Sequence, residues 1–149
     1  MKKGLIFLAI TVFATASCKK KEVIKTNTVE VEAAPSLIGN WEGYYGSRTI
    51  SASGDTSFYN PSYGYSMIFK SNGTANVYNT LLADSATGSL AQGSWVYSTN
   101  NTIVVNYTYV SSNQHFFVRA AIDSKMHAIN GKWYNNDGSV GGLFYLVKK

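Results

Sequence analysis

Residues 102–123 read TIVVNYTYVSSNQHFFVRAAID, and this stretch decides the fold class. Before and after the polar segment SSNQ (111–114), apolar or aromatic residues occupy every second position. Such alternation puts one set of side chains on one face of a β-strand, and Ser and Asn favour tight turns. The stretch therefore predicts two antiparallel strands that are joined by a turn and buried on one face.

The same alternation recurs along the chain from residue 36 onward. It predicts six further strands, at 40–46, 65–70, 74–79, 91–98, 128–134 and 141–149. An open meander of about eight strands would leave two edges unpaired, and closure into a barrel removes both. We therefore expect an all-β fold, a single antiparallel up-and-down barrel of about eight strands. The interior of such a barrel is either filled by side chains or holds one small ligand.

Segment 47–63 (SRTISASGDTSFYNPSY) is the one long irregular stretch of the predicted barrel. It fits either a strand with a loop or a flap over a barrel mouth. Tyr44, Tyr59 and Tyr63 lie in or beside it. If their rings are exposed, this segment would suit the docking of a protein or a sugar.

Each of the three tryptophans follows a glycine two positions earlier, in the phrases GNW (39–41), GSW (93–95) and GKW (131–133). In a strand, two residues at this spacing share one face. We expect the glycines to leave room for an indole from a neighbouring strand and to permit the sharp coiling of a small barrel.

The chain begins with MKK and an apolar run of about fourteen residues. This run is shorter than the roughly twenty residues that span a bilayer, but it is typical of a secretory signal. TASC (15–18) resembles a bacterial lipobox, whose cysteine carries the lipid; an ordinary secretory signal that contains a cysteine is the alternative. Cys18 is the only cysteine, so it has no intrachain disulfide partner. We predict a lipoprotein signal peptide (1–17), lipid attachment at Cys18 within a flexible tether (18–35), and a barrel domain (36–149).

This organisation predicts a protein of the Gram-negative cell envelope, anchored in the outer membrane on its periplasmic or its surface face. The formal net charge of the chain is +5, but the barrel domain holds seven basic and five acidic residues, which leaves +2. A nucleic-acid-binding domain clusters basic residues on one face, so nucleic acid is not an expected partner. The tether lysines instead suit anionic lipid headgroups.

Residue patterns that support catalysis or metal binding are absent from the sequence. His115 and His127 lie twelve positions apart on separate predicted elements, without zinc-ligand spacing. The four aspartates of the domain sit in predicted turns, and no serine lies in a G-x-S-x-G elbow. We therefore expect a binding protein without a cofactor or a metal, and not an enzyme.

PSLIGNW (35–41) resembles the opening motif of the lipocalins. GKWYNNDGSVGGLFYLVKK (131–149) resembles the last hairpin of bacterial lipocalin-like lipoproteins and, more distantly, of avidin-type barrels. The resemblance implies a barrel with a cavity that binds a small, mostly apolar molecule without catalysis. It also implies that Trp41 closes one end of the barrel beneath a basic side chain from a late strand, for which Arg119 is the candidate.

Nine residues are predicted to face the barrel interior: Tyr65, Met67, Phe69, Trp95, Tyr97, Tyr107, Tyr109, Trp133 and Tyr145. They form either a filled core or the wall of a cavity for a small hydrophobic or amphipathic ligand. The number of tyrosines favours a cavity, because a buried hydroxyl needs a partner. The alternative is a solid barrel that acts through segment 47–63 as an envelope assembly factor or an enzyme inhibitor, with an unknown protein partner.

Overall fold

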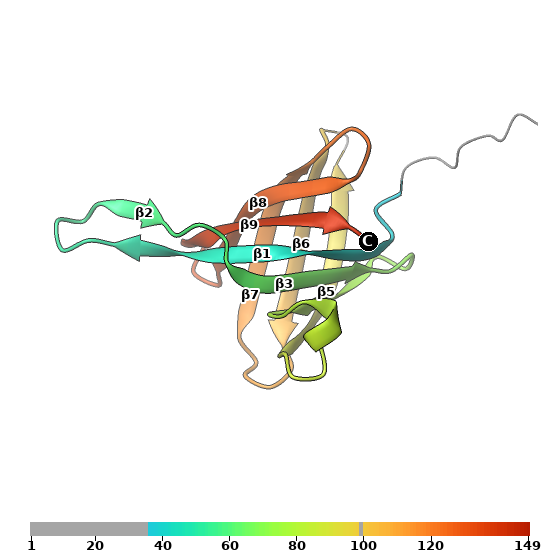
Figure 1. Ribbon diagram of the computed structural model, residues 1–149, viewed down its shortest axis with the longest axis horizontal. Helices are drawn as coiled ribbons and strands as arrows, with labels where there is room; N and C mark the ends of the chain where they lie inside the picture. The colour runs from blue at the N-terminus through green and yellow to red at the C-terminus, as the bar shows by residue number, and fades with distance from the viewer. Residues whose placement is uncertain (1–35, 99) are drawn as a thin grey trace, which may run out of the picture. The chain divides into compact units, whose positions relative to one another are not determined.

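The computed structural model describes residues 36–98 and 100–149, so the predicted signal peptide (1–17), lipid attachment at Cys18 and tether (18–35) lie outside the described residues. The described part contains nine strands and one short 3-10 helix (Figure 1). They are β1 (Gly39–Ile50), β2 (Thr56–Phe58), β3 (Tyr63–Phe69), β4 (Thr74–Tyr78), η1 (Leu82–Asp84), β5 (Leu90–Ser98), β6 (Thr102–Tyr109), β7 (His115–Ile122), β8 (Ala128–Asn135) and β9 (Val140–Lys148). The eight predicted strands are confirmed, with β1 longer than predicted and β2 additional.

Eight of these strands form a closed antiparallel barrel. From β3 to β9 each strand pairs with the next one in the chain, and β1 pairs with both β3 and β9, which closes the ring. The up-and-down order predicted from the alternation is therefore confirmed. β1 begins and β9 ends at one end of the barrel, the Trp41 end. The β4–β5 and β6–β7 connections lie at the other, the cavity end.

Segment 47–63 is a strand with a loop, the first of the two structures predicted for it. The pairing of β1 with β9 ends at Ser47 and Gly142. Beyond that point β1 pairs only with β2, where Arg48 lies opposite Phe58. The resulting two-stranded hairpin, residues 48–58, extends away from the barrel (Figure 1). Segment 47–63, which contains this hairpin, is called the arm below.

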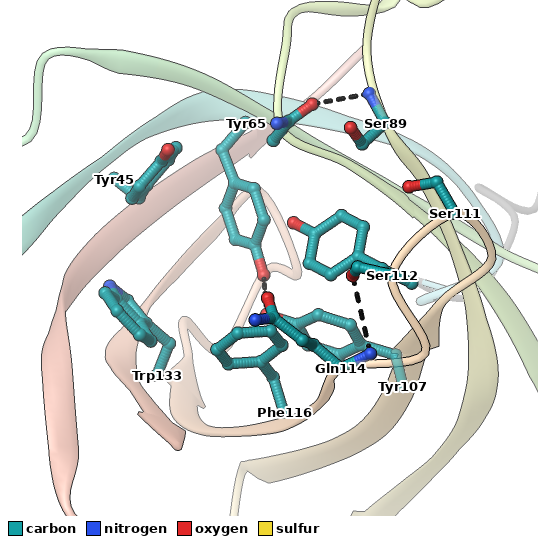
Figure 2. Close-up of a pocket in the computed structure, with 11 residues that line it drawn as sticks. Tyr45, Tyr65, Ser89, Tyr107, Ser111, Ser112, Gln114, Phe116 and Trp133 are labelled. Carbon is teal, nitrogen blue, oxygen red and sulfur yellow. Dashed lines mark hydrogen bonds between the residues drawn. The ribbon is translucent and has the colours of Figure 1, made fainter. Parts of the chain in front are cut away.

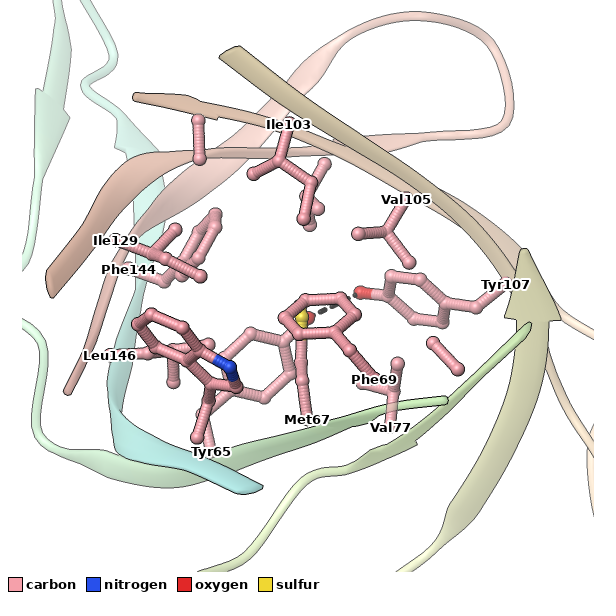
Figure 3. Packing of buried hydrophobic residues seen from close by; sticks show 14 of the residues in the cluster. Tyr65, Met67, Phe69, Val77, Ile103, Val105, Tyr107, Ile129, Phe144 and Leu146 are labelled. Carbon is pink, nitrogen blue, oxygen red and sulfur yellow. Dashed lines mark hydrogen bonds between the residues drawn. The ribbon is translucent and has the colours of Figure 1, made fainter. Parts of the chain in front are cut away.

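Buried hydrophobic side chains fill the barrel interior near the Trp41 end (Figure 3). Trp41 is fully buried; its indole Nε1 donates a hydrogen bond to the Leu37 carbonyl oxygen at 2.8 Å, and its ring meets Phe69 edge-on at 6.3 Å. The remaining core residues recur at every second position of the strands, among them Met67, Val77, Ile103, Val105, Val118, Ile129 and Leu146. Trp41 is thus part of the filled end of the barrel, where the first strand begins.

The basic side chain beside Trp41 is Lys148, so the prediction of Arg119 for this role was wrong. Lys148 Nζ lies 5.8 Å from the centroid of the Trp41 ring and donates a hydrogen bond to the Ser36 carbonyl oxygen. Arg119 is exposed on the outer face of β7 because its neighbour Val118, which is fully buried, takes the inner face. The last strand, through Lys148, supplies the cation.

Tyr145 does not face the interior, which corrects a second prediction. Its side chain is 38% exposed on the outer face of β9, whereas Phe144 and Leu146 are buried. The Phe144 ring meets Tyr65 edge-on at 5.6 Å inside the barrel. All five residues of LFYLV (143–147) are apolar or aromatic, so alternation of polarity could not select the inner face of this strand.

The glycines of the three Gly-x-Trp phrases serve two different purposes. A Cβ atom at Gly93 would lie 1.8 Å from the Asn106 carbonyl oxygen, and one at Gly131 would lie 2.4 Å from the Arg119 carbonyl oxygen. At both positions a neighbouring strand, β6 for Gly93 and β7 for Gly131, occupies the space that the glycine leaves, and no indole does. Gly39 instead adopts a φ of +126°, which residues with a side chain rarely adopt.

Candidate functional site

A cavity of about 300 Å³ lies at the end of the barrel opposite Trp41 (Figure 2). Two kinds of residue line it. Six are aromatic and are called the aromatic wall: Tyr45, Tyr65, Tyr107, Tyr109, Phe116 and Trp133. Five are polar and are called the polar wall: Asn79, Ser89, Ser111, Ser112 and Gln114. The barrel is therefore filled at one end and hollow at the other.

The rings of the aromatic wall hold each other in place. Phe116 meets Trp133 edge-on at 5.9 Å and stacks on Tyr107 at 6.0 Å, and Tyr45 meets Trp133 edge-on at 6.4 Å. These are the geometries that aromatic pairs prefer. Their strands, β1, β6, β7 and β8, bring together residues that are far apart in the chain.

Trp133 is held by a hydrogen bond and by a close packing contact. Its Nε1 donates a hydrogen bond to the Gly46 carbonyl oxygen at 3.1 Å. A Cβ atom at Gly141 would lie only 1.9 Å from the Trp133 ring, so this indole packs directly on a glycine backbone. The predicted indole-on-glycine contact therefore exists, but it is made by Gly141 and not by a glycine of a Gly-x-Trp phrase.

The polar wall comes from the connections at the cavity end. Asn79 and Ser89 stand at the two ends of the β4–β5 connection, where the Ser89 N–H donates to Asn79 Oδ1 at 2.7 Å. The β6–β7 turn contributes Ser112, whose hydroxyl accepts from the Gln114 N–H at 3.4 Å. Figure 2 shows Ser89 and Ser111 at the upper right of the cavity and Tyr45 and Trp133 on its left. All eleven lining residues lack a formal charge at neutral pH.

A pair of tyrosines forms the buried part of the cavity. Tyr65 on β3 and Tyr107 on β6 point toward one another, and their hydroxyl oxygens are 2.9 Å apart (Figure 3). Burial raises the pKa of Tyr65, and so does the nearby Tyr107. Burial also raises the pKa of Tyr107, with a further contribution from Tyr109. Both hydroxyls therefore stay protonated over the physiological range.

Four of the nine predicted interior residues line the cavity, namely Tyr65, Tyr107, Tyr109 and Trp133. Four others belong to the core or pack against it: Met67, Phe69, Trp95 and Tyr97. The sequence analysis omitted Tyr45 and Phe116, although their spacing from Trp41 and from Val118 puts them on inner faces. No sequence signal identifies the polar wall, because turn serines and asparagines occur at every connection.

Alkaline pH is expected to destabilise the fold. Burial raises the pKa of Tyr109 from 10.0 to about 12, and it also raises those of Tyr65 and Tyr107. Above pH 10.0 the unfolded chain loses these protons while the folded chain keeps them. Stability that is fully present below the unfolded pKa is therefore lost as the pH rises toward the folded values. Urea unfolding at increasing pH measures the loss.

Urea unfolding of the double variant Tyr65→Phe/Tyr107→Phe at the same pH values is the control for this prediction. The variant lacks two of the responsible hydroxyls, so its stability should fall less steeply with pH. An unfolding midpoint that does not change between the unfolded pKa and the value of about 12 for Tyr109 would contradict the assignment.

Comparisons with known proteins add no family to this site. No family model and no curated protein matches the sequence. Within residues 36–98 and 100–149, no three His, Cys, Asp or Glu side chains are grouped so that they could hold a metal ion. In the same part of the chain, no helix has both the length and the apolar character to cross a membrane.

Proposed function

We propose that the barrel is a non-catalytic, lipocalin-like binding domain that takes up a small, uncharged, amphipathic molecule in its cavity. One observation carries this proposal: a cavity of about 300 Å³ is lined by both the aromatic wall and the polar wall. Cavities that enclose small molecules begin at about this volume, and they combine aromatic surface with a few polar groups. A ligand with an apolar ring and a polar edge matches both walls.

The absence of charge among the lining residues supports an uncharged ligand. An ion that enters a cavity loses its hydration, and it is stabilised only where a partner of opposite charge replaces the water. No side chain of either wall supplies such a partner. The same feature argues against catalysis, because general acids and bases need a pKa near the working pH, whereas that of Tyr109 is about 12.

Lipid anchoring at Cys18 in the outer membrane of a Gram-negative envelope is the second part of the proposal. It is supported by TASC (15–18) and by the absence of any other cysteine. The described chain begins at Ser36, beside Lys148 at the Trp41 end. A tether that leads to Ser36 would therefore join the barrel at the Trp41 end.

Fluorescence titration with N-phenyl-1-naphthylamine, an uncharged probe that brightens in apolar sites, tests the binding function. We expect the full chain to bind it saturably. The variant Ser111→Trp places an indole at the polar wall and should weaken binding about tenfold or more. Ser94→Trp is the matched control, because Ser94 is exposed on β5 and does not line the cavity. Equal affinity in both variants would rule out this cavity as the site.

Native mass spectrometry on protein recovered from its host's membranes would identify the cargo. An adduct that Ser111→Trp removes would be the ligand, and the mass of the N-terminal peptide would report the modification of Cys18. A protein without an adduct that also fails to bind the probe would shift the function to the arm.

The arm is the second candidate site, favoured by the exposure of its aromatic residues. Tyr59 is 62% and Tyr63 59% exposed, and Phe58 at the end of β2 is also exposed. Tyr44, the third tyrosine expected at this surface, is half-buried with its ring 5.8 Å from Tyr145. Under this alternative, the protein is an envelope assembly factor or an enzyme inhibitor that binds its partner through the arm.

A further inference from the structure

We propose that the Tyr65–Tyr107 hydroxyl pair is the polar anchor of the ligand, and that the ligand is a planar ring compound carrying an oxygen acceptor, a carbonyl, ether or hydroxyl, at its leading edge. The inference rests on the proposed function and adds the chemical class of the ligand to it. It follows from the hydrogen count of the pair, from its burial and from the rings around it.

The two hydroxyls carry two hydrogens, and the hydrogen bond between them uses only one. Each tyrosine carries one O–H hydrogen, and one hydrogen bond of 2.9 Å joins the two oxygens. Whichever oxygen donates, the hydrogen of the other has no acceptor among the described residues. Both residues line the cavity, so this hydrogen is available to an acceptor that a ligand brings.

The position of the pair makes its hydroxyls accessible from the cavity. Tyr65 and Tyr107 are almost fully buried, and both line the cavity. The pair therefore lies at the inner limit of the site, with the polar wall at the connections. The raised pKa values of both residues keep the hydroxyls protonated and able to donate.

The surrounding rings favour a planar compound. Tyr65 meets Tyr45 edge-on at 5.5 Å, and Tyr107 stacks on Phe116 at 6.0 Å. A flat apolar ring can extend this set of edge-to-face and stacked contacts. The leading oxygen of such a ring would meet the free hydrogen of the pair.

Matched uncharged probes test the anchor. One pair is 2-naphthol and 2-methylnaphthalene, which differ by a hydroxyl against a methyl group. The other is 2-methoxynaphthalene and 2-ethylnaphthalene, in which an oxygen that only accepts is replaced by CH₂. For each pair, the ratio of the two dissociation constants is measured on the wild-type full chain and on Tyr65→Phe/Tyr107→Phe.

We expect the preference for the oxygen-bearing probe to fall about tenfold in the double variant for both pairs. Tyr97→Phe is the control, because its hydroxyl bonds Asn101 at 2.8 Å outside the cavity; it should leave both ratios unchanged. If the double variant does not fold, at least one of the two single variants must lower the ratios.

Two results would overturn the anchor and leave the binding function intact. In the first, the probes bind but the ratios stay the same in every variant. In the second, only the 2-naphthol ratio falls, which would mean that the ligand donates the hydrogen bond instead of accepting it. If none of the four probes binds the wild-type chain, the anchor fails, and the proposed function fails with it only if N-phenyl-1-naphthylamine does not bind either.

Discussion

Replacement of Trp41 by alanine is expected to lower the free energy of unfolding by about 3–5 kcal/mol. Trp41 is fully buried, and its ring packs against Phe69 at the filled end of the barrel. The substitution would leave a cavity in the barrel interior beside Phe69, which the paired strands of a closed barrel cannot collapse to fill. It would also leave the Leu37 carbonyl oxygen without the indole donor at 2.8 Å.

Urea unfolding of the full chain, followed by circular dichroism, measures this effect. Trp41→Phe keeps most of the packing and loses the hydrogen bond to Leu37, so we expect about 1–3 kcal/mol. Trp95→Ala is the matched control, since it removes a half-buried indole that contacts the same Phe69 ring at 5.6 Å. If Trp41→Ala lowers the free energy of unfolding no more than Trp95→Ala does, Trp41 does not have the structural role that is assigned to it here.

The resemblance to the lipocalin opening motif implied a tryptophan at one end of the barrel with a basic side chain beside it, but it did not identify that side chain. GNW places Trp41 on the first strand, and a late basic residue was expected beside it. Which late residue reaches the ring depends on strand stagger: Trp41 lies opposite Lys148 on β9. Arg119 has the right charge, but its position on β7 faces outward.

The alternation of apolar and polar residues predicted the inner face correctly in strands whose outward-facing residues are polar. TIVVNYTY has Asn and Thr on its outer face, so Ile103, Val105 and Tyr107 were placed correctly inside. LFYLV (143–147) has no polar residue on either face, and there the prediction of Tyr145 as an interior residue was wrong. Polarity selects a face only where the two faces differ in it.

Depth along the barrel was not predictable from the sequence. Tyr65, Met67 and Phe69 share the inner face of β3, yet only Tyr65 reaches the cavity, while the other two fill the core. Period-two spacing gives the face of a residue. Its height above the closed end depends on the register of all eight strands. The same limit applies to the polar wall, whose members come together only when the β4–β5 and β6–β7 connections meet at one end.

Replacement of Gly93 by alanine is expected to cost about 3 kcal/mol or more. The added Cβ would lie 1.8 Å from the Asn106 carbonyl oxygen and 2.7 Å from Tyr107 Cα, both of which are backbone atoms of β6. Relief of this clash requires β5 and β6 to separate, which breaks their hydrogen bonds. Gly131→Ala should behave similarly, because the backbone of Arg119 on β7 lies 2.4 Å from the position of its Cβ.

Gly39→Ala is the comparison that separates close approach from backbone conformation. Gly39 has a φ of +126°, and the nearest atom to its Cβ position is Lys148 Cε at 3.7 Å. Gly39→Ala should therefore lower the free energy of unfolding only through the unfavourable φ, by about 1–3 kcal/mol. Urea unfolding of the three variants measures their free energies of unfolding, and we expect Gly39→Ala to be the least destabilised.

The glycine of GSW also links the fold to the proposed site, because Gly93 lies opposite Tyr107. Any shift of β6 that accommodates a Cβ at Gly93 would move Tyr107 away from Tyr65 and disturb the hydroxyl pair. Gly93→Ala should therefore weaken probe binding even where the chain still folds, whereas Gly39→Ala, at the Trp41 end, should not. If Gly93→Ala is as stable as Gly39→Ala and binds the probe normally, close strand approach is not why glycine occupies this position.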